Sequence, residues 1–400
     1  MNIATPIADA ALTVDDVVRR SHALRFELKD AGKRADETGS DTIEGIARVN
    51  EEKLQYLAVP KAYGGLSDGS PAFGGEAWNE IVVNLSASDA SLGQTYLSTQ
   101  LVIRSILQAG DAVPKEVAEE IFDGVLHRGL RMAASASEAG SKRPVTIAKV
   151  PGGVRVDGVK TFNSGSGSGG VAAVAGRMES HPGMYHALVR LEADGVTLHN
   201  DWDNMGQRGT CSQTITYDNV FVPDGWHFPT SGLAPALIPI GFMLHGALVL
   251  GSGFGALDTA TEYVRDNNRV SLRRFEKAVD DPLMMRRIGV MSAKLNAALA
   301  FQRQTCRRID TGISSPEEMK EVMMDGFRVK CVSVEAGVEV ASDLFDLTGA
   351  RSTSNTHRFD RFWRNARTFA CHDPVDPLYN WIGQWELEKK DPDFFTQFGF

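Results

Sequence analysis

Residues 364–374 read Arg-Asn-Ala-Arg-Thr-Phe-Ala-Cys-His-Asp-Pro. This basic stretch ends in a histidine beside an aspartate, His372 and Asp373. A histidine side chain exchanges protons near neutral pH, and a neighbouring carboxylate can hold its ring in place. The pair therefore predicts a site of proton transfer. A structural alternative stays open, because the same two side chains could cap the helix that follows.

The composition is that of a globular protein. With 400 residues, of which 42% are hydrophobic, the chain exceeds the usual size of a single core, so two or three subdomains are expected. The net charge of −9 is spread along the sequence and argues against nucleic acid as a partner. The 4 cysteines show no CxxC spacing, and the 9 histidines show no metal-ligand spacing. We therefore predict reduced thiols, a cytoplasmic protein and no metal site. No signal peptide is expected, since residues 1–18 lack a basic start and a compact apolar run.

Three regions differ in their hydrophobic period. Residues 13–130 have a helical pattern, with Thr13 as a predicted N-cap and helices predicted over 75–87 and 92–109. Short strand-like runs follow, at residues 145–150, 153–159, 171–178, 185–191 and 214–222, with a hairpin signal at residues 151–153. Long helices are then predicted over 242–268, 281–311 and 316–348, with a shorter one after Pro377.

This partition predicts an α+β protein with three domains. We expect an N-terminal α-helical domain over residues 1–130, a central β-barrel domain over 131–230 and a C-terminal four-helix bundle over 231–400. Residues 225–257 contain no Asp, Glu, Lys or Arg, which is long enough for a membrane span. Three prolines interrupt this stretch, so we predict a loop and then a buried helix from about Ile240, and no membrane partner.

Four further motifs accompany residues 364–374. Residues 139–141 read Ala-Gly-Ser, residues 156–165 read Val-Asp-Gly-Val-Lys-Thr-Phe-Asn-Ser-Gly, residues 205–210 read Met-Gly-Gln-Arg-Gly-Thr, and residues 217–223 read Tyr-Asp-Asn-Val-Phe-Val-Pro. In order and spacing they resemble the acyl-CoA dehydrogenase family over roughly residues 20–390. The resemblance implies the fold of that family and a homotetramer.

The family's dehydrogenases need a carboxylate base, which they keep at one of two places. These places fall on Asp373 and Gly246, so neither holds a glutamate. The His-Asp-Pro-Val run beginning at His372 resembles the branch that uses reduced flavin and oxygen, most closely the sulfur-heterocycle and sulfone monooxygenases. We expect Gly246 to leave empty volume for a bulky substrate ring.

The resemblance also implies a set of site residues. The predicted catalytic residues are His372, Asp373 and Ser164, the last with its hydroxyl near flavin N5 or the flavin peroxide. Flavin contacts are predicted for Ser137, Ser141, Ser164, Trp202, Arg273, Arg274, Arg351 and His372, with Arg351 reaching a flavin in a neighbouring subunit. Tyr96, Phe242 and Gly246 are predicted to line the substrate pocket. Purely structural roles are the alternatives: a turn serine at Ser164, a core tyrosine at Tyr96 and a solvated arginine pair at residues 273–274.

The predicted cofactor is FMN, supplied in its reduced form, with FAD as an alternative. The family's arginine and glutamine signature for the adenine half of FAD is replaced here by Arg-Arg-Phe-Glu at residues 273–276, which favours FMN. No GxGxxG lies between a strand and a helix, so the electrons must come from a separate NAD(P)H-dependent flavin reductase.

The sequence thus predicts a two-component flavin monooxygenase. It would use O2, through a C4a-(hydro)peroxyflavin, to oxygenate a sulfur-containing or heteroaromatic small molecule. Three alternatives remain at this point. They are an acyl-CoA dehydrogenase with Asp373 as its base, an N-hydroxylase of an amine or amino sugar with the same fold, and a flavin-free scaffold.

Overall fold

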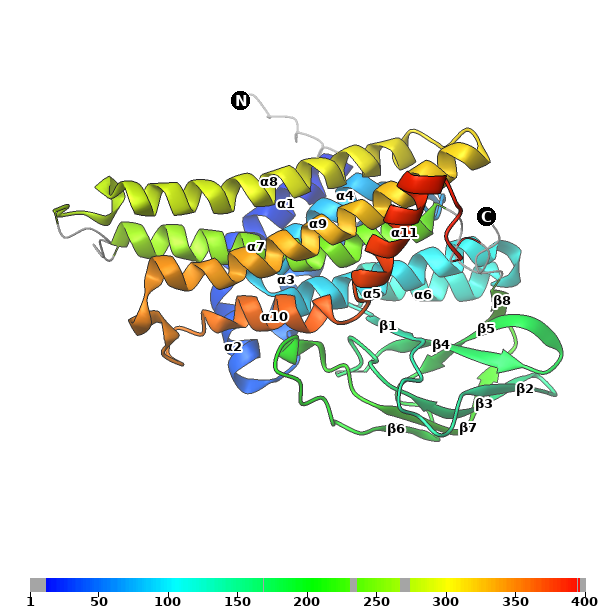
Figure 1. The fold of residues 1–400 in the computed structure, drawn as a ribbon. Coiled ribbons are helices and arrows are strands. Elements are labelled where there is room, and N and C mark those ends of the chain that lie inside the picture. The colour runs from blue at the N-terminus through cyan, green and yellow to red at the C-terminus, as the bar shows by residue number, and fades with distance from the viewer. Residues whose placement is uncertain (1–11, 168, 231–235, 267–273, 394, 396–400) are drawn as a thin grey trace, which may run out of the picture.

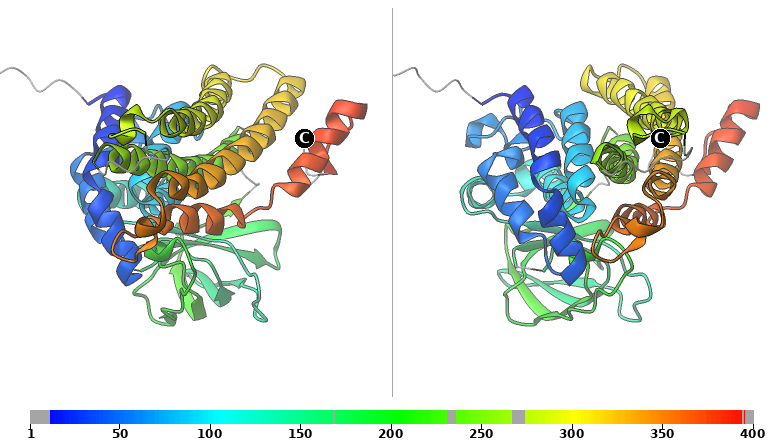
Figure 2. Two further views of the ribbon diagram at one scale, coloured as in Figure 1. Left: turned by 60° about the vertical axis from the view of Figure 1, so that its left-hand side comes forward. Right: turned by 90° about the vertical axis from the view of Figure 1, so that its left-hand side faces the viewer.

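The computed structural model describes residues 12–167, 169–230, 236–266, 274–393 and 395. Within these residues, helices lie on both sides of a block of strands in the sequence, and in space they form one layer above a sheet (Figures 1 and 2). Among the described residues, α7 is the one helix that is long and apolar enough to span a bilayer. However, 83% of its most apolar window is buried inside the protein, as expected for a core helix.

The helices before the sheet pack around α4 and α5. Their bounds are α1 Val14–Glu27, α2 Lys29–Thr38, α3 Ile43–Glu51, α4 Gly75–Ser88, α5 Ala90–Ala109 and α6 Lys115–His127. Thr13 caps α1 as predicted, in a reciprocal capping box with Asp16. Most side chains of α4 and α5 are buried, so these two helices lie in the interior of the molecule.

The sheet has eight strands in the order β6-β7-β3-β2-β4-β5-β8, with β1 beside β4. Their bounds are β1 Met132–Ser135, β2 Thr146–Val150, β3 Gly153–Lys160, β4 Val171–Met178, β5 His181–Arg190, β6 Val196–Leu198, β7 Ile215–Pro223 and β8 His227–Thr230. Only one residue pair, Thr146 with Arg177, joins β2 to β4. The sheet therefore consists of two halves, which enclose a common apolar core that includes Val154 and Val174.

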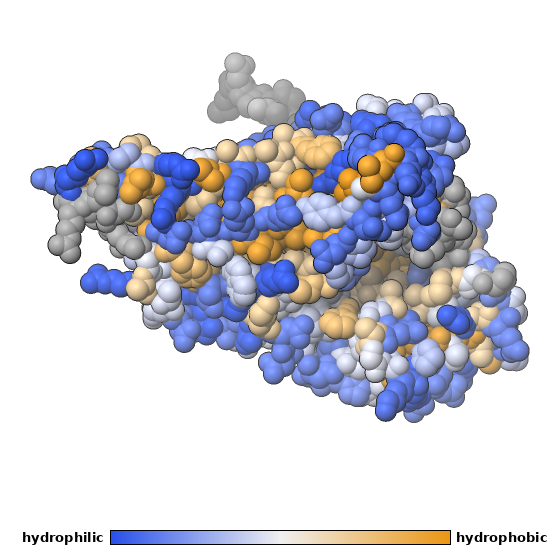
Figure 3. Space-filling model, in the orientation of Figure 1, coloured by the Kyte–Doolittle hydropathy of each residue, from blue (hydrophilic) through white to orange (hydrophobic). Residues whose placement is uncertain are grey.

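Long helices return after the sheet. Their bounds are α7 Leu237–Asp266, α8 Pro282–Asp310, α9 Pro316–Thr348, α10 Asp360–Ala370 and α11 Asp376–Glu388. Ser315 caps α9 by accepting a hydrogen bond from the Glu318 N–H, as predicted from the Ser-Pro pair. The helices α7, α8 and α9 pack against one another, α10 packs on α7 and α9, and α11 packs on α9. Hydrophilic residues cover the tips of the helices and the outer side of the sheet, whereas apolar residues gather in the middle of the helical layer (Figure 3).

Three features differ from the sequence prediction. The short strands β1, β6 and β8 were not predicted, and β8 lies in a stretch expected to be a loop. The basic stretch that begins at Arg364 lies where no helix was predicted, but it belongs to α10, whose buried side chains recur at helical spacing. Two of those buried side chains, Arg361 and Asn365, are polar, which hides the helical stripe in the sequence.

Candidate functional site

One part of the site is a chain of hydrogen bonds at the edge of the sheet. It starts at Gln94 on α5, whose Nε2 lies 3.3 Å from Ser164 Oγ. Ser164 Oγ lies 2.8 Å from Ser212 Oγ, which lies 2.7 Å from Thr210 Oγ1. Thr210 Oγ1 donates to the Gln207 carbonyl at 2.8 Å. These five residues, which we call the hydroxyl chain, join the turn after β3 to the loop before β7.

The turn that carries Ser164 is held in an unusual conformation. Phe162 has φ of 57°, a value that bulky residues rarely adopt outside functional or strained sites. Asn163 fixes the turn, because its amide donates to the carbonyls of Lys160 and Gln213. As a result Phe162 is 49% exposed and meets Trp202 edge-on, with ring centroids 5.9 Å apart.

Trp202 is attached to the hydroxyl chain. Its indole N–H donates to the Gln207 carbonyl at 2.8 Å, the same oxygen that Thr210 uses. Phe162 and Trp202 therefore present two aromatic rings beside Ser164. Such rings suit stacking against a planar heterocycle.

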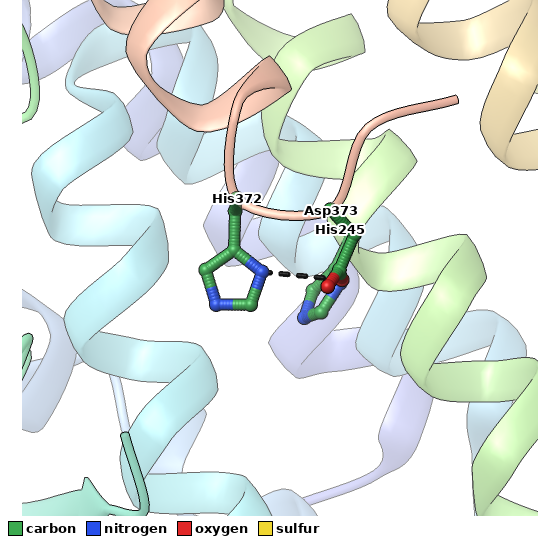
Figure 4. Close-up of side chains that lie close together, drawn as sticks. All are labelled: His245, His372 and Asp373. Carbon is green, nitrogen blue, oxygen red and sulfur yellow. Dashed lines mark hydrogen bonds and ion pairs between the residues drawn. The ribbon is translucent and has the colours of Figure 1, made fainter. Parts of the chain in front are cut away.

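The second part of the site is a group of four ionisable side chains around Asp373. Its Oδ2 lies 3.0 Å from His245 Nδ1 on α7, 3.2 Å from His372 Nδ1 and 3.2 Å from Lys330 Nζ on α9. Figure 4 shows His372 and Asp373 on the loop after α10, with His245 approaching from α7. We call these four residues the Asp373 cluster. Phe369 stacks on the His372 ring at 5.2 Å.

Electrostatics fix the charge state of most of the Asp373 cluster. Burial by itself would raise the pKa of the Asp373 carboxyl, but hydrogen bonds from His245 and His372 and the charge of Lys330 hold it well below its usual range. Burial lowers the pKa of His245 to about 4, so this imidazole is neutral near pH 7. Burial also lowers the pKa of Lys330, which Asp373 partly offsets.

Because Asp373 is held as a carboxylate, both imidazoles donate to it through Nδ1–H. For His372, which is half exposed, this leaves Nε2 as the ring nitrogen that can meet a ligand. The alternative role as a helix cap is wrong for Asp373 and His372. The following helix, α11, has Val375 at its N-cap and no side-chain cap.

The Asp373 cluster also has the residue types of a metal site. Ligand atoms of His245, His372 and Asp373 lie within 4.8 Å of one another. However, the Lys330 ammonium contacts the same carboxylate oxygen that a metal would need. A divalent cation there would meet a fixed positive charge, so the geometry favours a hydrogen-bonded cluster over a metal site.

Helix α10 connects the two parts of the site. Asn365 accepts a hydrogen bond from the Gln207 N–H at 2.7 Å, and Arg364 donates to the Met205 carbonyl at 2.7 Å. At Gly206 the chain runs so close to α10 that an added Cβ would lie 2.2 Å from the Arg364 carbonyl oxygen. Arg364 also forms a two-bond ion pair with Asp36 on α2. Motif residues 205–210 therefore fix α10, the helix that leads into the His372 loop, next to the loop before β7.

The other predicted flavin contacts form no hydrogen bond with the hydroxyl chain or the Asp373 cluster among the described residues. Ser137 pairs with Thr161 at 3.3 Å, and Ser141 bonds within its own loop to Arg143. Arg274 and Arg351 are exposed, and the segments that carry them form the far end of the helical layer, at the left in Figure 1. Arg273 lies outside the described residues.

The three predicted substrate contacts differ in their surroundings. Phe242 lies beside the Asp373 cluster, with its ring 5.2 Å from Lys330 Nζ. Tyr96 is only 4% exposed and donates its hydroxyl proton to the Leu54 carbonyl at 3.0 Å. The empty volume expected at Gly246 is absent, because an added Cβ would lie 3.0 Å from Ser333 Cβ on α9. That glycine allows α7 and α9 to approach closely instead.

Sequence reasoning missed several residues of the site, including His245, Lys330, Ser212 and Thr210. His245 and Lys330 lie far from His372 in the sequence, and only helix packing brings them together. Thr210 ends the motif at residues 205–210 and Ser212 comes two residues later, but no spacing rule links either of them to Ser164. The one available signal was His245, a polar residue in the middle of the otherwise apolar stretch over residues 236–257.

Comparisons with known proteins identify relatives of the chain. Residues 243–377 match the model of the acyl-CoA dehydrogenase C-terminal domain. A dibenzothiophene monooxygenase of Mycolicibacterium goodii is 28% identical over 380 residues, which cover 89% of this chain and 90% of the relative. The chain is a homologue of the dibenzothiophene monooxygenases.

Two further relatives extend this assignment. The probable FMNH2-dependent monooxygenase SfnC of Pseudomonas putida is 26% identical, over 94% of this chain and 95% of that protein. The structure of TdsC from Paenibacillus sp. A11-2 with FMN and indole has a TM-score of 0.82 and 25% identity, and covers 94% of this chain and 98% of that chain. The fold prediction is thus confirmed, and the named homologues are monooxygenases, one of them described as FMNH2-dependent and another solved with FMN bound.

The residues present fit a flavin. Gln94 Oε1, Thr368 Oγ1 and both amide atoms of Gln207 are buried and have no hydrogen-bond partner within the described part of the chain. Such atoms normally require a partner. All three residues border the hydroxyl chain or the Gly206 contact with α10, where the amide and carbonyl edge of an isoalloxazine could satisfy them.

Proposed function

We propose that this protein is the oxygenase component of a two-component flavin monooxygenase. It takes reduced FMN from a separate NAD(P)H-dependent flavin reductase and uses O2 to oxygenate a sulfur-containing or heteroaromatic small molecule. The observation that carries the proposal is the Asp373 cluster between α7, α9 and the loop after α10, in a chain that is homologous to dibenzothiophene monooxygenases. FAD is the alternative cofactor.

Reduced FMN would supply two electrons, so that one oxygen atom enters the substrate and the other leaves as water. Trp202 and Phe162 would bind the ring of the cofactor, and Ser164 would bind its edge. His372 would hold or release a proton at Nε2, because its Nδ1–H is committed to Asp373. Phe242, next to the same cluster, would contact the apolar part of the substrate.

The dehydrogenase alternative is disfavoured by the state of Asp373. A base must be able to take up a proton, but three donors surround one oxygen of this carboxylate and hold its pKa well below its usual range. Asp373 therefore serves to orient His372 and does not abstract a substrate proton.

Several wider features belong to the same proposal. We propose domains over residues 1–130, 131–230 and 231–400, a homotetramer and a cytoplasmic location. Arg273, Arg274 and Arg351 would then act on the phosphate of a flavin in a neighbouring subunit, which accords with the exposure of Arg274 and Arg351 here. Ser137 and Ser141 would contribute hydroxyls to the flavin tail.

The decisive experiment mixes the purified protein with an FMN reductase, NADH, FMN and 18O2. Candidate substrates are thioethers, sulfones, indoles and amines. We expect one 18O atom per product molecule on a thioether, sulfone or indole. Products from amines alone would instead indicate an N-hydroxylase. Bleaching of bound oxidised flavin by an acyl-CoA would establish the dehydrogenase, and failure to bind flavin in either redox state would leave a scaffold.

A further inference from the structure

The hydroxyl chain has only one possible direction for its protons. The Gln207 carbonyl can only accept, so Thr210 must use its single hydroxyl proton there. Thr210 can then only accept from Ser212, and Ser212, with its own proton used, can only accept from Ser164. At the other end, the Gln94 amide nitrogen can only donate a hydrogen bond, and Ser164 Oγ accepts it.

This direction is fixed by burial. Thr210 is 1% exposed, Ser212 5% and Gln207 3%, so water does not compete for these bonds. The Gln207 carbonyl also accepts from the Trp202 indole, which holds it in place. Ser164, by contrast, is only partly buried. Its open side therefore presents an oxygen lone pair and no proton.

We propose that Thr210 and Ser212 are positioning residues that make Ser164 a hydrogen-bond acceptor, and that they thereby make the site select reduced over oxidised flavin. The inference rests on the proposed function, in which Ser164 binds the edge of the isoalloxazine near N5. In reduced flavin N5 carries a hydrogen and donates. In oxidised flavin N5 presents a lone pair, which would face the lone pair of Ser164.

The test compares three ligands by equilibrium binding. They are FMN, FMN reduced with dithionite under anaerobic conditions, and 5-deaza-FMN, in which a C–H replaces N5. The wild-type protein should bind reduced FMN about tenfold or more tightly than FMN, the scale of one hydrogen bond gained or opposed. It should also bind 5-deaza-FMN more tightly than FMN, because the opposed lone pair is gone.

In Thr210→Val the Ser212 hydroxyl loses its acceptor and can turn back to Ser164, which frees the Ser164 proton. We expect the preference for reduced FMN to fall roughly tenfold and the advantage of 5-deaza-FMN to disappear. Thr210→Ser keeps the hydroxyl and should restore both preferences. Thr216→Val is the control, because it makes the same substitution on β7 at a hydroxyl that pairs with His199 and does not belong to the hydroxyl chain. This variant should bind all three ligands as the wild type does.

The outcomes separate the inference from the proposed function. If the wild-type protein binds none of the three ligands, both are rejected. If it binds FMN but a folded Thr210→Val retains the wild-type preferences, the inference alone is overturned. Should Thr210→Val not fold, Ser212→Ala replaces it, since this variant also removes the acceptor of the Ser164 proton and should lose both preferences.

Discussion

Lys330 Nζ on α9 lies 3.2 Å from Asp373 Oδ2 on the loop after α10. The lysine side chain is 3% exposed, so an almost fully buried cation holds a carboxylate that is itself half exposed. The cost of desolvating the ammonium is offset by this partner, and the two imidazoles complete the carboxylate's hydrogen bonds. The orientation of His372 thus depends on a residue on a different helix.

We expect His372→Ala to uncouple flavin oxidation from product formation. The imidazole would no longer control a proton at the site, so reduced flavin would be consumed with release of hydrogen peroxide. Product should fall roughly 10²-fold or more, the scale for loss of a general acid–base group. Peroxide and product are measured together per NADH consumed. Cys371→Ala on the same loop is the control, and full coupling in the His372 variant would refute this role.

Lys330→Met and Asp373→Asn should both weaken coupled turnover, because each change disturbs the orientation of His372. Each single change should lower it by roughly tenfold, less than the loss of the histidine itself. Because both act by orienting His372, the double variant should be no worse than the more impaired single variant. Lys294→Met removes a lysine from a half-exposed ion pair with Glu339 and should leave turnover unchanged. Independent, multiplying effects would show that Lys330 does not act through Asp373.

The stability of the protein should fall on mild acidification because of His245. Its pKa in the folded protein is about 4, against an ordinary value of 6.5, so folding favours the neutral ring. This contribution is fully present above pH 6.5 and is lost as the pH falls from 6.5 towards 4. Urea unfolding at pH 7.5 and 4.5 should show wild type losing about 1–3 kcal/mol more than His245→Gln.

The groups that face His245 are Asp373, His372 and Lys330. Asp373 changes charge only below this window, since its pKa is depressed. His22→Gln replaces an exposed histidine and should keep the wild-type dependence on pH. An identical loss of stability in wild type and His245→Gln would contradict the assignment.

Two glycines offer a matched test of the contact between α10 and the sheet. Gly206→Ala places a Cβ 2.2 Å from a backbone oxygen of α10, so it should destabilise the protein by about 1–3 kcal/mol and lower coupled turnover. Gly289→Ala on α8 meets no atom within 4 Å and should be neutral or stabilise by about 0.5–1 kcal/mol. Both are measured by thermal unfolding. Equal melting temperatures would show that Gly206 does not fix α10.

The fold was largely predictable because its signals are local. The span of α9 follows from a cap and an apolar period, and β4 follows from a run of apolar residues. The site was only half predictable. His372 and Ser164 came from short motifs that remain contiguous in sequence, whereas their partners Lys330 and Ser212 come from packing across tens of residues. The expectation of space at Gly246 was wrong because the identity of a residue does not reveal which helix faces it.

The Asp373 cluster also bears on how readily this protein could change its chemistry. Replacing Asp373 with a longer acid would not by itself produce a dehydrogenase, because the Lys330 charge and hydrogen bonds from His245 and His372 would still hold the new group as a carboxylate. Several substitutions on three separate segments would be needed together, and the intermediates would carry a buried charge without its partner. The ion pairing at this loop therefore makes a stepwise change from this site to a dehydrogenase site unfavourable.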